Sequence, residues 1–243
     1  MERLIALDRS VIVAADVAGY PELKNLAKAM NGVAGISAFK FGIEAGLDGL
    51  ERSVGVVQDW FYFDVLPVYD HQKAGNDIPQ MGGKFAKKLV SCGIKAAILF
   101  PFAGPKTQRE WTSACEGEGL RVIVGGVMTH PEFLVSEGGY IADDTPERIF
   151  RLAVEQGVRD FVVPGNKIEW VLRLKGILDE LLGEGNHVLY APGLISQGGD
   201  VTECGRAAGK YFHGIIGSAI YERRTRDGMR EVALLATSKL AVA

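Results

Sequence analysis

Short apolar runs with many β-branched residues recur along the whole chain, separated by longer amphipathic segments. The runs occupy residues 11–16, 36–41, 65–70, 95–100, 121–126, 160–164, 187–192 and 211–216. Most of them are apolar at consecutive positions, as expected of parallel strands that are covered on both faces. Their spacing of roughly 25–35 residues fits a repeated strand–helix unit. The pattern therefore predicts an α/β protein with a parallel sheet.

Helical signals occur between these runs. Residues 21–30 begin with Pro21, and residues 143–157 open with Asp-Asp-Thr-Pro and close on Gly157, which are common first and last residues of helices. A longer helix is predicted over residues 167–185. Its expected apolar stripe comprises Ile168, Val171, Leu172, Leu174, Ile177 and Leu178.

Eight strand–helix units can form a closed barrel or an open, doubly wound sheet. A dinucleotide-binding sheet would carry Gly-x-Gly-x-x-Gly after its first strand, but residues 14–21 read AADVAGYP. No linker or low-complexity segment divides the chain, and 243 residues suit one barrel. We therefore predict a single (β/α)8 TIM barrel over residues 1–243, with residues 1–9 packed beneath its floor.

Composition narrows the function classes. The hydrophobic fraction of 47% excludes a disordered chain, and the net charge of −3 favours neither nucleic acid nor an anionic membrane as a partner. No run of about 18 apolar residues is present to span a membrane. Cys92, Cys115 and Cys204 lie far apart, which favours buried thiols in a reducing compartment. We expect a soluble, cytoplasmic protein.

Active sites of TIM barrels lie at the carboxyl ends of the strands. The polar residues at the predicted ends are Asp16, Lys40, Asp70, Thr129 and Gln197, accompanied by glycines at 193, 198, 199 and 217. Residues 69–79, YDHQKAGNDIP, add Lys73 and Asp77. Alternating carboxylates and ammonium groups would keep the carboxylates ionised and a lysine protonated, ready to deliver a proton. On composition alone, a solvated charged loop remains the alternative.

The segment 69–79 resembles the signature of the orotidine 5'-monophosphate decarboxylase family, in which the third strand ends in Asp-x-Lys-x-x-Asp-Ile-Pro. Residues 191–200, APGLISQGGD, resemble the phosphate loop of that family. Further matching segments, AADV (14–17), FKFG (39–42), GVMTHPEF (126–133) and IIGSAIY (215–221), follow in the right order. The resemblance covers nearly the whole chain.

The resemblance implies a role for each residue of the charged cluster. Asp16 would bind a ribose hydroxyl, and Lys40 would bridge the ribose and Asp70. Asp70 would face the substrate carboxylate, and Lys73 would protonate the carbon that loses carbon dioxide. Asp77, contributed by the partner subunit of a homodimer, would bind ribose and hold Lys73.

The same resemblance implies the nucleotide-binding residues. Thr129 would reach the pyrimidine, and Gln197 would span pyrimidine and phosphate. The phosphate site would also use Pro192, the N–H groups of Gly198 and Gly199, and the helix start at Gly217 and Ser218. Two segments have no assigned role: His71 and Gln72 are expected to be outward-pointing spacers, and residues 137–144 form either a lid or a surface loop.

The implied reaction is a cofactor-free decarboxylation of orotidine 5'-monophosphate to uridine 5'-monophosphate in pyrimidine synthesis. An ammonium group already in place stabilises the developing carbanion and then protonates it. No metal is expected, and the four histidines show no HxH or HExxH spacing. The alternative is a metal-dependent sugar-phosphate decarboxylase or aldolase on the same barrel, such as a hexulose-phosphate synthase; such an enzyme would favour a carboxylate near Lys40.

The chain departs from the family pattern in two places that bear on function. Asp70, Lys73 and Asp77 are spaced by three and four residues instead of two and three, so the loop must bulge or follow another path. Ser218 stands where the family has an arginine that grips phosphate. Arg223 and Arg224 could substitute for that arginine or be solvated helix residues.

Overall fold

Eight parallel strands form a closed barrel in the computed structural model, which describes residues 2–61, 65–74 and 76–243, except for the side chains of Lys73 and Ala74. Neighbouring strands pair in chain order, and the last strand pairs with the first. The strands are β1 (Arg9–Ala14), β2 (Ile36–Phe41), β3 (Leu66–Asp70), β4 (Ala96–Leu99), β5 (Arg121–Gly125), β6 (Asp160–Val162), β7 (Val188–Ala191) and β8 (Phe212–Ile216). Each lies within two residues of its predicted position.

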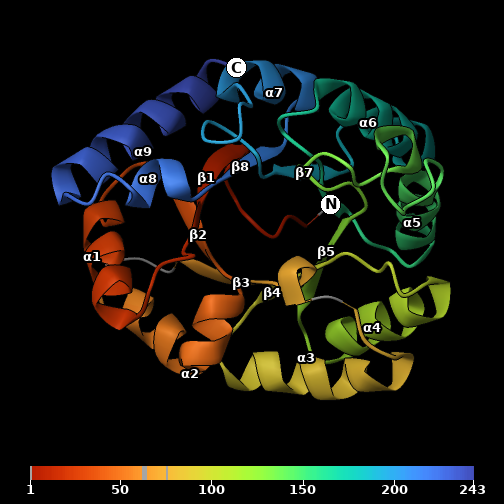
Figure 1. Ribbon diagram of the computed structural model, residues 1–243, viewed down its shortest axis with the longest axis horizontal. Coiled ribbons are helices and arrows are strands. Elements are labelled where there is room, and N and C mark those ends of the chain that lie inside the picture. Colours follow the sequence, from red (N-terminus) through yellow and green to blue (C-terminus); the bar gives the residue numbers. More distant parts are fainter. Residues whose placement is uncertain (1, 62–64, 75) are drawn as a thin grey trace.

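Helices surround the barrel as an outer ring (Figure 1). The α-helices are α1 (Tyr20–Met30), α2 (Ile43–Gln58), α3 (Gly82–Ser91), α4 (Pro105–Gly117), α5 (Thr145–Glu155), α6 (Ile168–Leu182), α7 (Val201–Ala208), α8 (Ser218–Tyr221) and α9 (Arg226–Ala241). Short 3-10 helices among the described residues are η1 (His71–Ala74), η2 (Pro79–Met81) and η3 (Val135–Glu137). The predicted (β/α)8 TIM barrel is confirmed. Among the described helices, none is both long and apolar enough to cross a bilayer.

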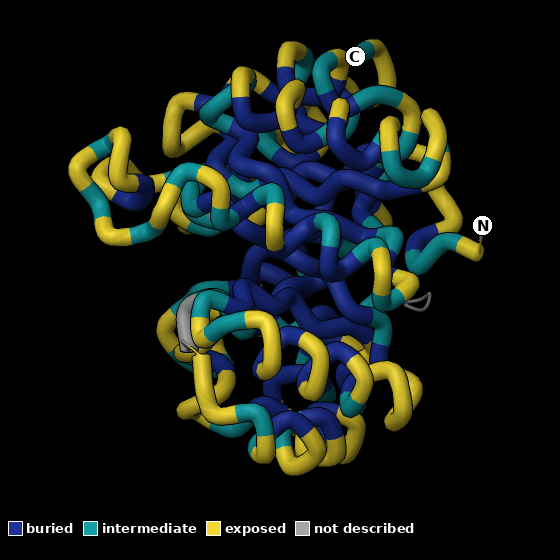
Figure 2. The backbone as a smooth tube through the Cα atoms, turned by 90° about the vertical axis from the view of Figure 1, so that its right-hand side faces the viewer, coloured by how far each residue is buried: buried dark blue, intermediate teal, exposed yellow. Residues whose placement is uncertain are grey.

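Apolar side chains fill two separate layers. One cluster lies inside the barrel and includes Ile98, Ile123 and Tyr190, whereas the larger cluster lies between the strands and the helices. Buried backbone accordingly occupies the middle of the molecule, and exposed backbone lies at its rim (Figure 2). The predicted stripe of α6 is wrong at Leu172, which is 54% exposed. Leu172 lies roughly 160° around the helix from the buried Leu174, because successive residues turn by about 100°.

The amino-terminal segment crosses the interior of the ring in the view of Figure 1. Ile5 is 5% exposed and packs against the cluster inside the barrel, so the expected position beneath the floor is confirmed for the described residues. Two pairs of polar side chains contact each other at this end of the barrel. Oγ of Ser10 lies 2.7 Å from Nδ1 of His213, and the hydroxyl of Tyr190 donates to Oδ1 of Asp160 at 2.8 Å.

The three cysteines are buried and unpaired. Burial raises the pKa of Cys115 and of Cys204 to about 12, so both remain thiols at neutral pH. These residues are parts of the core and not nucleophiles, as their scattered positions predicted.

Candidate active site

Three adjacent strands bring acidic and basic residues together at one end of the barrel. Lys40 lies in β2, where it pairs with Ala14 of β1 and with Val68 of β3. Asp16 follows β1 by two residues, and Asp70 is the last residue of β3. Because neighbouring strands of this barrel are parallel, their carboxyl ends lie on the same side. The structure therefore places all three predicted residues at the expected end.

Lys40 bridges two carboxylates. Its Nζ atom donates to Oδ2 of Asp70 at 2.6 Å and to Oδ2 of Asp16 at 3.2 Å. The side chains of Lys40 and Asp70 are 4% and 0% exposed, whereas that of Asp16 is 22% exposed. Gly42 makes room for this arrangement, since a Cβ atom there would lie 2.4 Å from Oδ1 of Asp16. The cluster is thus buried at Asp70 and opens towards solvent at Asp16.

The two carboxylates keep Lys40 charged. Burial alone lowers the pKa of Lys40, but attraction to Asp70 and then to Asp16 outweighs burial and raises the pKa above its ordinary value. The ammonium group is therefore present throughout the neutral range. A fixed cation between two anions can orient a hydroxyl-bearing ligand and can offset part of the repulsion between Asp70 and a second anionic group.

The long spacing after Asp70 is accommodated by a 3-10 turn, η1. The backbone N–H of Gln72 donates to Oδ1 of Asp70 at 3.2 Å, and its side-chain Nε2 donates to Oδ2 at 3.2 Å. The prediction that Gln72 points outward as a spacer is wrong, because the turn folds its amide back over the carboxylate. Gln72 instead helps to satisfy the buried Asp70, which already accepts a hydrogen bond from Lys40.

His71 faces the helices and not the barrel mouth. Its ring stacks on Trp111 of α4 with centroids 4.9 Å apart, and lies 4.4 Å from the ring of Phe85 in α3. Burial lowers the pKa of His71, although Asp70 and Asp77 partly oppose this effect. A half-buried neutral ring in an aromatic cluster is a packing residue. The prediction that His71 points away from the barrel mouth is correct, but its ring packs against the helices and is not a solvent-exposed spacer.

Lys73 and Asp77 are the two remaining residues of the signature. The side chain of Lys73 lies outside the part of the chain that the structure describes. The backbone of Lys73 occupies the third position of η1. Asp77 is exposed, and its Oδ1 accepts a hydrogen bond from the N–H of Ile78 at 2.7 Å. The loop is fastened to α4, because Nε1 of Trp111 donates to the carbonyl of Ile78 at 3.1 Å.

An apolar groove of about 1210 Å³ borders Asp77. Residues of α2 and α3 line much of it, together with Tyr69 and His71. Several large apolar side chains stand out of the surface here: Leu47 is 83% exposed and Ile43 is 42% exposed, while Ile78 beside Asp77 is 59% exposed. Exposed apolar residues gathered around a groove mark a surface suited to binding another macromolecule.

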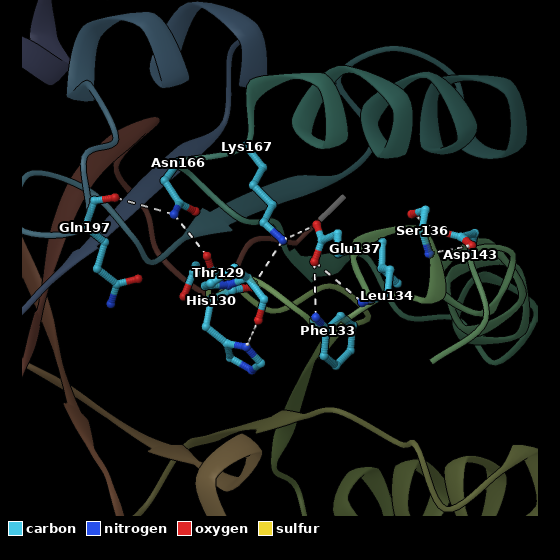
Figure 3. Close-up of polar contacts among 11 residues, drawn as sticks. Thr129, His130, Phe133, Leu134, Ser136, Glu137, Asp143, Asn166, Lys167 and Gln197 are labelled. Carbon is cyan, nitrogen blue, oxygen red and sulfur yellow. Dashed lines mark hydrogen bonds and ion pairs between the residues drawn. The ribbon is translucent and has the colours of Figure 1, made fainter. Parts of the chain in front are cut away.

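The loops after β5 and β7 meet through a residue of the turn after β6 (Figure 3). Nδ2 of Asn166 donates to the carbonyl of Thr129 at 3.0 Å and to the carbonyl of Gln197 at 3.4 Å. The structure thus brings Thr129 and Gln197, both predicted to reach a pyrimidine, to opposite sides of one amide. Gln197 is exposed, and Thr129 is partly exposed.

The predicted phosphate loop has a different donor set from the one expected. The N–H groups of Gly198 and Gly199 donate to the carbonyls of Ile195 and Gly193, each at 3.1 Å. They are therefore used within the turn and do not point freely at an anion. The carbonyl of Pro192 accepts from the N–H of Gly165 at 2.8 Å, so this residue contributes to the scaffold of the loop.

Gly217 caps the amino terminus of the one-turn helix α8, which begins at Ser218. The first N–H groups of any helix lack partners within the helix. Arg223 and Arg224 are both exposed beyond the end of α8, and Arg224 has a left-handed backbone with φ of 61°. Within the described residues, no group of three or more His, Cys, Asp or Glu side chains is arranged to hold a metal ion.

Two curated relatives carry the same name, although no family model matches the chain. The orotidine 5'-phosphate decarboxylase of Thermoplasma volcanium is 24% identical over 216 residues, which cover 89% of this chain and 87% of the relative. The enzyme of the same name from Methanosarcina mazei is 25% identical over 158 residues, or 65% of this chain and 66% of the relative. This chain is related to the orotidine 5'-phosphate decarboxylases. The resemblance predicted from the motifs is thereby confirmed.

Two solved structures share the fold. Orotidine 5'-monophosphate decarboxylase from Methanocaldococcus jannaschii, complexed with the inhibitor BMP, has a TM-score of 0.75 at 19% identity and covers 96% of this chain and 98% of that one. Orotidine 5'-phosphate decarboxylase from Pyrococcus horikoshii OT3 has the same TM-score at 22% identity, covering 95% and 99% of the two chains. The barrel is thus matched over almost its whole length.

Sequence reasoning missed Asn166 and Lys167. Both follow the predicted strand 160–164, so the rule that singled out polar residues at other strand ends would have found them. Lys167 donates to Oε1 of Glu137 at 2.5 Å and to the carbonyl of His130 at 3.2 Å. The segment 137–144 forms a surface turn in which Tyr140 is fully exposed, and its lid role stays a prediction.

Proposed function

We propose that this protein decarboxylates orotidine 5'-monophosphate to uridine 5'-monophosphate and carbon dioxide. The observation that carries the proposal is the buried Asp70–Lys40–Asp16 chain at the mouth of the barrel. It combines a solvent-excluded carboxylate with a fixed ammonium group, in a chain related to orotidine 5'-phosphate decarboxylases. The 3-10 turn after Asp70 keeps Lys73 within one turn of this chain.

In the proposed mechanism the ring–carboxylate bond breaks, and its electron pair stays on the ring carbon. The Lys73 ammonium lies beside that carbon, lowers the energy of the developing carbanion and then donates a proton to it. Asp70, paired with Lys40, faces the leaving carboxylate and disfavours the bound ground state relative to the transition state. Carbon dioxide leaves as a neutral molecule, and the ammonium becomes an amine that solvent reprotonates.

The surrounding residues would bind the nucleotide. Asp16, which is the solvent-facing end of the charged chain, is suited to accept a ribose hydroxyl, with Lys40 next to it. Thr129 and Gln197 would contact the pyrimidine from the other wall. The phosphate would lie between the loop 193–199 and the first turn of α8, with Gln197 and Ser218 as neutral donors.

We further propose that a second copy of the chain covers the groove between α2 and α3. The exposed Asp77 lines this groove together with Leu47 and Ile43, and Ile78 next to Asp77 is a further exposed apolar residue. A two-fold interface centred here would give each site the Asp77 of its partner. The three free thiols suit the reducing cytoplasm in which pyrimidine synthesis is expected.

The test is an absorbance assay with orotidine 5'-monophosphate in the presence of excess chelator. We expect turnover that is the same with and without chelator, because the charged residues supply both the electrostatic stabilisation and the proton. Activity that disappears in chelator and returns with magnesium would favour the metal-dependent sugar-phosphate enzyme. A hexulose phosphate serves as the matched substrate for that alternative, and we expect no turnover of it.

A further inference from the structure

A single side-chain amide connects the two loops that are predicted to hold the pyrimidine. Nδ2 of Asn166 uses its two hydrogens on the carbonyls of Thr129 and Gln197, which are 3.0 and 3.4 Å away. Figure 3 shows the amide between the two loops, with Lys167 on the other side of the same turn. We refer to Asn166 and its two carbonyl partners as the amide bridge.

The turn that carries Asn166 is packed backbone to backbone against the loop after β7. The N–H of Gly165 donates to the carbonyl of Pro192 at 2.8 Å. A Cβ atom on Gly199 would lie 2.8 Å from the carbonyl oxygen of Gly165, and one on Gly193 would lie 3.0 Å from Oδ1 of Asn166. Because no side chain separates these segments, the loop 193–199 cannot shift without moving the turn.

The other loop is fastened to the same turn at a second point. Lys167 forms an ion pair with Glu137 at 2.5 Å, and Glu137 accepts hydrogen bonds from the N–H groups of Phe133 and Leu134. Lys167 also donates to the carbonyl of His130, the residue after Thr129. The outer part of the loop after β5 is therefore held independently of the amide bridge, which leaves Asn166 to fix its inner end at Thr129.

The two carbonyls that accept from Nδ2 fix the orientation of the Asn166 amide, and Oδ1 of Asn166 makes no hydrogen bond to a described residue that would do so. Oδ1 of Asn166 is shielded from solvent and has no hydrogen-bond partner among the described residues. A flipped amide would place that oxygen against two carbonyl oxygens, which is unfavourable. A buried oxygen without a partner costs stability, and proteins tolerate such costs mainly where a functional arrangement requires them.

We propose that Asn166 is a positioning residue that sets the spacing between Thr129 and Gln197 for a ligand that touches both loops at once. The inference rests on the proposed function, because that ligand is a pyrimidine nucleotide. Its two halves, the pyrimidine and the phosphate, are covalently joined at a fixed separation. A loop that drifts relative to its partner therefore weakens binding of the whole nucleotide far more than binding of either half.

The experiment compares three probes by calorimetry: uridine 5'-monophosphate, uridine and inorganic phosphate. In Asn166→Ala we expect affinity for the nucleotide to fall about tenfold or more, since displacements near 1 Å can cost roughly 100-fold. Affinity for inorganic phosphate should change by less than about twofold, and affinity for uridine should fall less than affinity for the nucleotide, because uridine touches both loops only through its pyrimidine. In steady-state assays KM should rise more than kcat falls, because the residue touches neither the reacting carbon nor the proton donor.

Two further variants distinguish loss of the two hydrogen bonds from loss of side-chain volume. Asn166→Asp has the same shape but no N–H donors, so we expect at least the loss seen with Ala. Asn186→Ala is the matched control, because Asn186 also donates its Nδ2 to a backbone carbonyl, that of Leu182 at 3.1 Å, but beyond the far end of α6. That control should bind all three probes like the original protein.

Amide hydrogen exchange of the free protein tests the bridge without any nucleotide. In Asn166→Ala the N–H groups of Gly198 and Gly199 should exchange at least about tenfold faster, because the turn that protects them loses its anchor. Unchanged exchange together with unchanged nucleotide affinity would overturn the proposal, as would an equal loss for all three probes. An original protein that binds no uridine 5'-monophosphate would refute the proposed function, and faster exchange would still support the bridge.

Discussion

The Nζ atom of Lys40 lies 2.6 Å from Oδ2 of Asp70, whose side chain is completely shielded from solvent. Removing one partner of such a pair leaves a buried charge without compensation, which costs about 3–5 kcal/mol. We therefore expect Lys40→Met to lower the free energy of unfolding by about this amount and to abolish decarboxylation. Urea titration monitored by circular dichroism measures the first effect.

The matched control removes both charges. In Lys40→Met combined with Asp70→Asn, the buried carboxylate is gone, so most of the lost stability should return while activity stays absent. If the double variant is as unstable as Lys40→Met alone, then loss of side-chain packing and not the unpaired charge explains the effect.

Lys73 is expected to supply the proton. Replacing it with Ala should reduce turnover by at least about 1000-fold, because general-acid and electrostatic contributions are lost together. The fold should persist, since this residue follows the buried strand β3 and lies in a one-turn helix outside the barrel. Single-turnover measurements on saturated enzyme isolate the chemical step. Near-normal turnover would mean that another group protonates the product.

Asp77 is expected to act in the partner's site. Mixing inactive Lys73→Ala protein with inactive Asp77→Ala protein should restore activity as subunits exchange, because each mixed dimer contains one intact site. The recovered activity should approach a quarter of that of the unmodified protein, roughly as random pairing of equal amounts predicts. Absence of recovery despite verified exchange would assign Asp77 to its own subunit.

The exposed Leu47 provides a control for this experiment. A charge at this position would be buried without a partner in the proposed dimer, so Leu47→Glu should weaken dimerisation and prevent recovery. Sedimentation at several protein concentrations measures the dimer directly. An unchanged dimer would show that the subunits meet elsewhere.

His213 should make the protein less stable in mild acid. Burial, and then repulsion from Arg3, lowers the pKa of His213 to about 3 from an ordinary value of 6.5. Between these two pH values the unfolded chain binds a proton that the folded chain does not, so stability rises with pH in this window. The contribution of His213 should therefore be complete above about pH 6.5 and fall by up to roughly 1.4 kcal/mol for each pH unit below it.

The measurement is the difference in slope between two proteins. His213→Gln cannot bind a proton in either state, so its free energy of unfolding should fall less steeply between pH 6.5 and pH 4 than that of the original protein. The absolute stability at pH 7 also changes, because Ser10 loses its contact with the ring. Parallel slopes in the two proteins would show that His213 is protonated in the folded state.

The barrel could be predicted from the sequence because its signals are local and repeated. Apolar runs mark buried parallel strands wherever they occur, and all eight appear within two residues of their predicted positions. Asp16, Lys40 and Asp70 could be placed at one end because a parallel barrel gathers its strand ends there. The distances among them depend on register and rotamers, which no pattern of residue types specifies.

The errors arise where the path of a turn decides which way a polar group points, or where the closed barrel joins distant segments. Gln72 was expected to face outward, but its amide turns back to a carboxylate that would otherwise keep an acceptor unsatisfied. The N–H groups of Gly198 and Gly199 were expected to face an anion, but they close a tight turn. Asn166 lies 37 residues along the chain from Thr129, and only the closed barrel brings them together.

The last prediction concerns the phosphate site, where Ser218 stands at the position of the phosphate-binding arginine of the orotidine 5'-monophosphate decarboxylase family. Loss of one charged hydrogen bond weakens binding by roughly 1.5–3 kcal/mol, or about 10–150-fold. Arg223 and Arg224 are the nearest replacements in sequence, but both are exposed after α8 has ended. A Cβ atom on Gly228 would lie 3.2 Å from Cβ of Arg223, which places Arg223 against the start of α9. We therefore expect a site made of neutral donors.

In that case Arg223→Ala and Arg224→Ala should each change the affinity for uridine 5'-monophosphate by less than tenfold, with little dependence on salt. Conversely, Ser218→Arg should tighten binding by about 10–150-fold, because it supplies the missing charged hydrogen bond next to the first turn of α8. Calorimetry across a salt series distinguishes the two possibilities. A loss above tenfold in either alanine variant, steepest at low salt where charges are least screened, would identify that arginine as the phosphate ligand and contradict the neutral site.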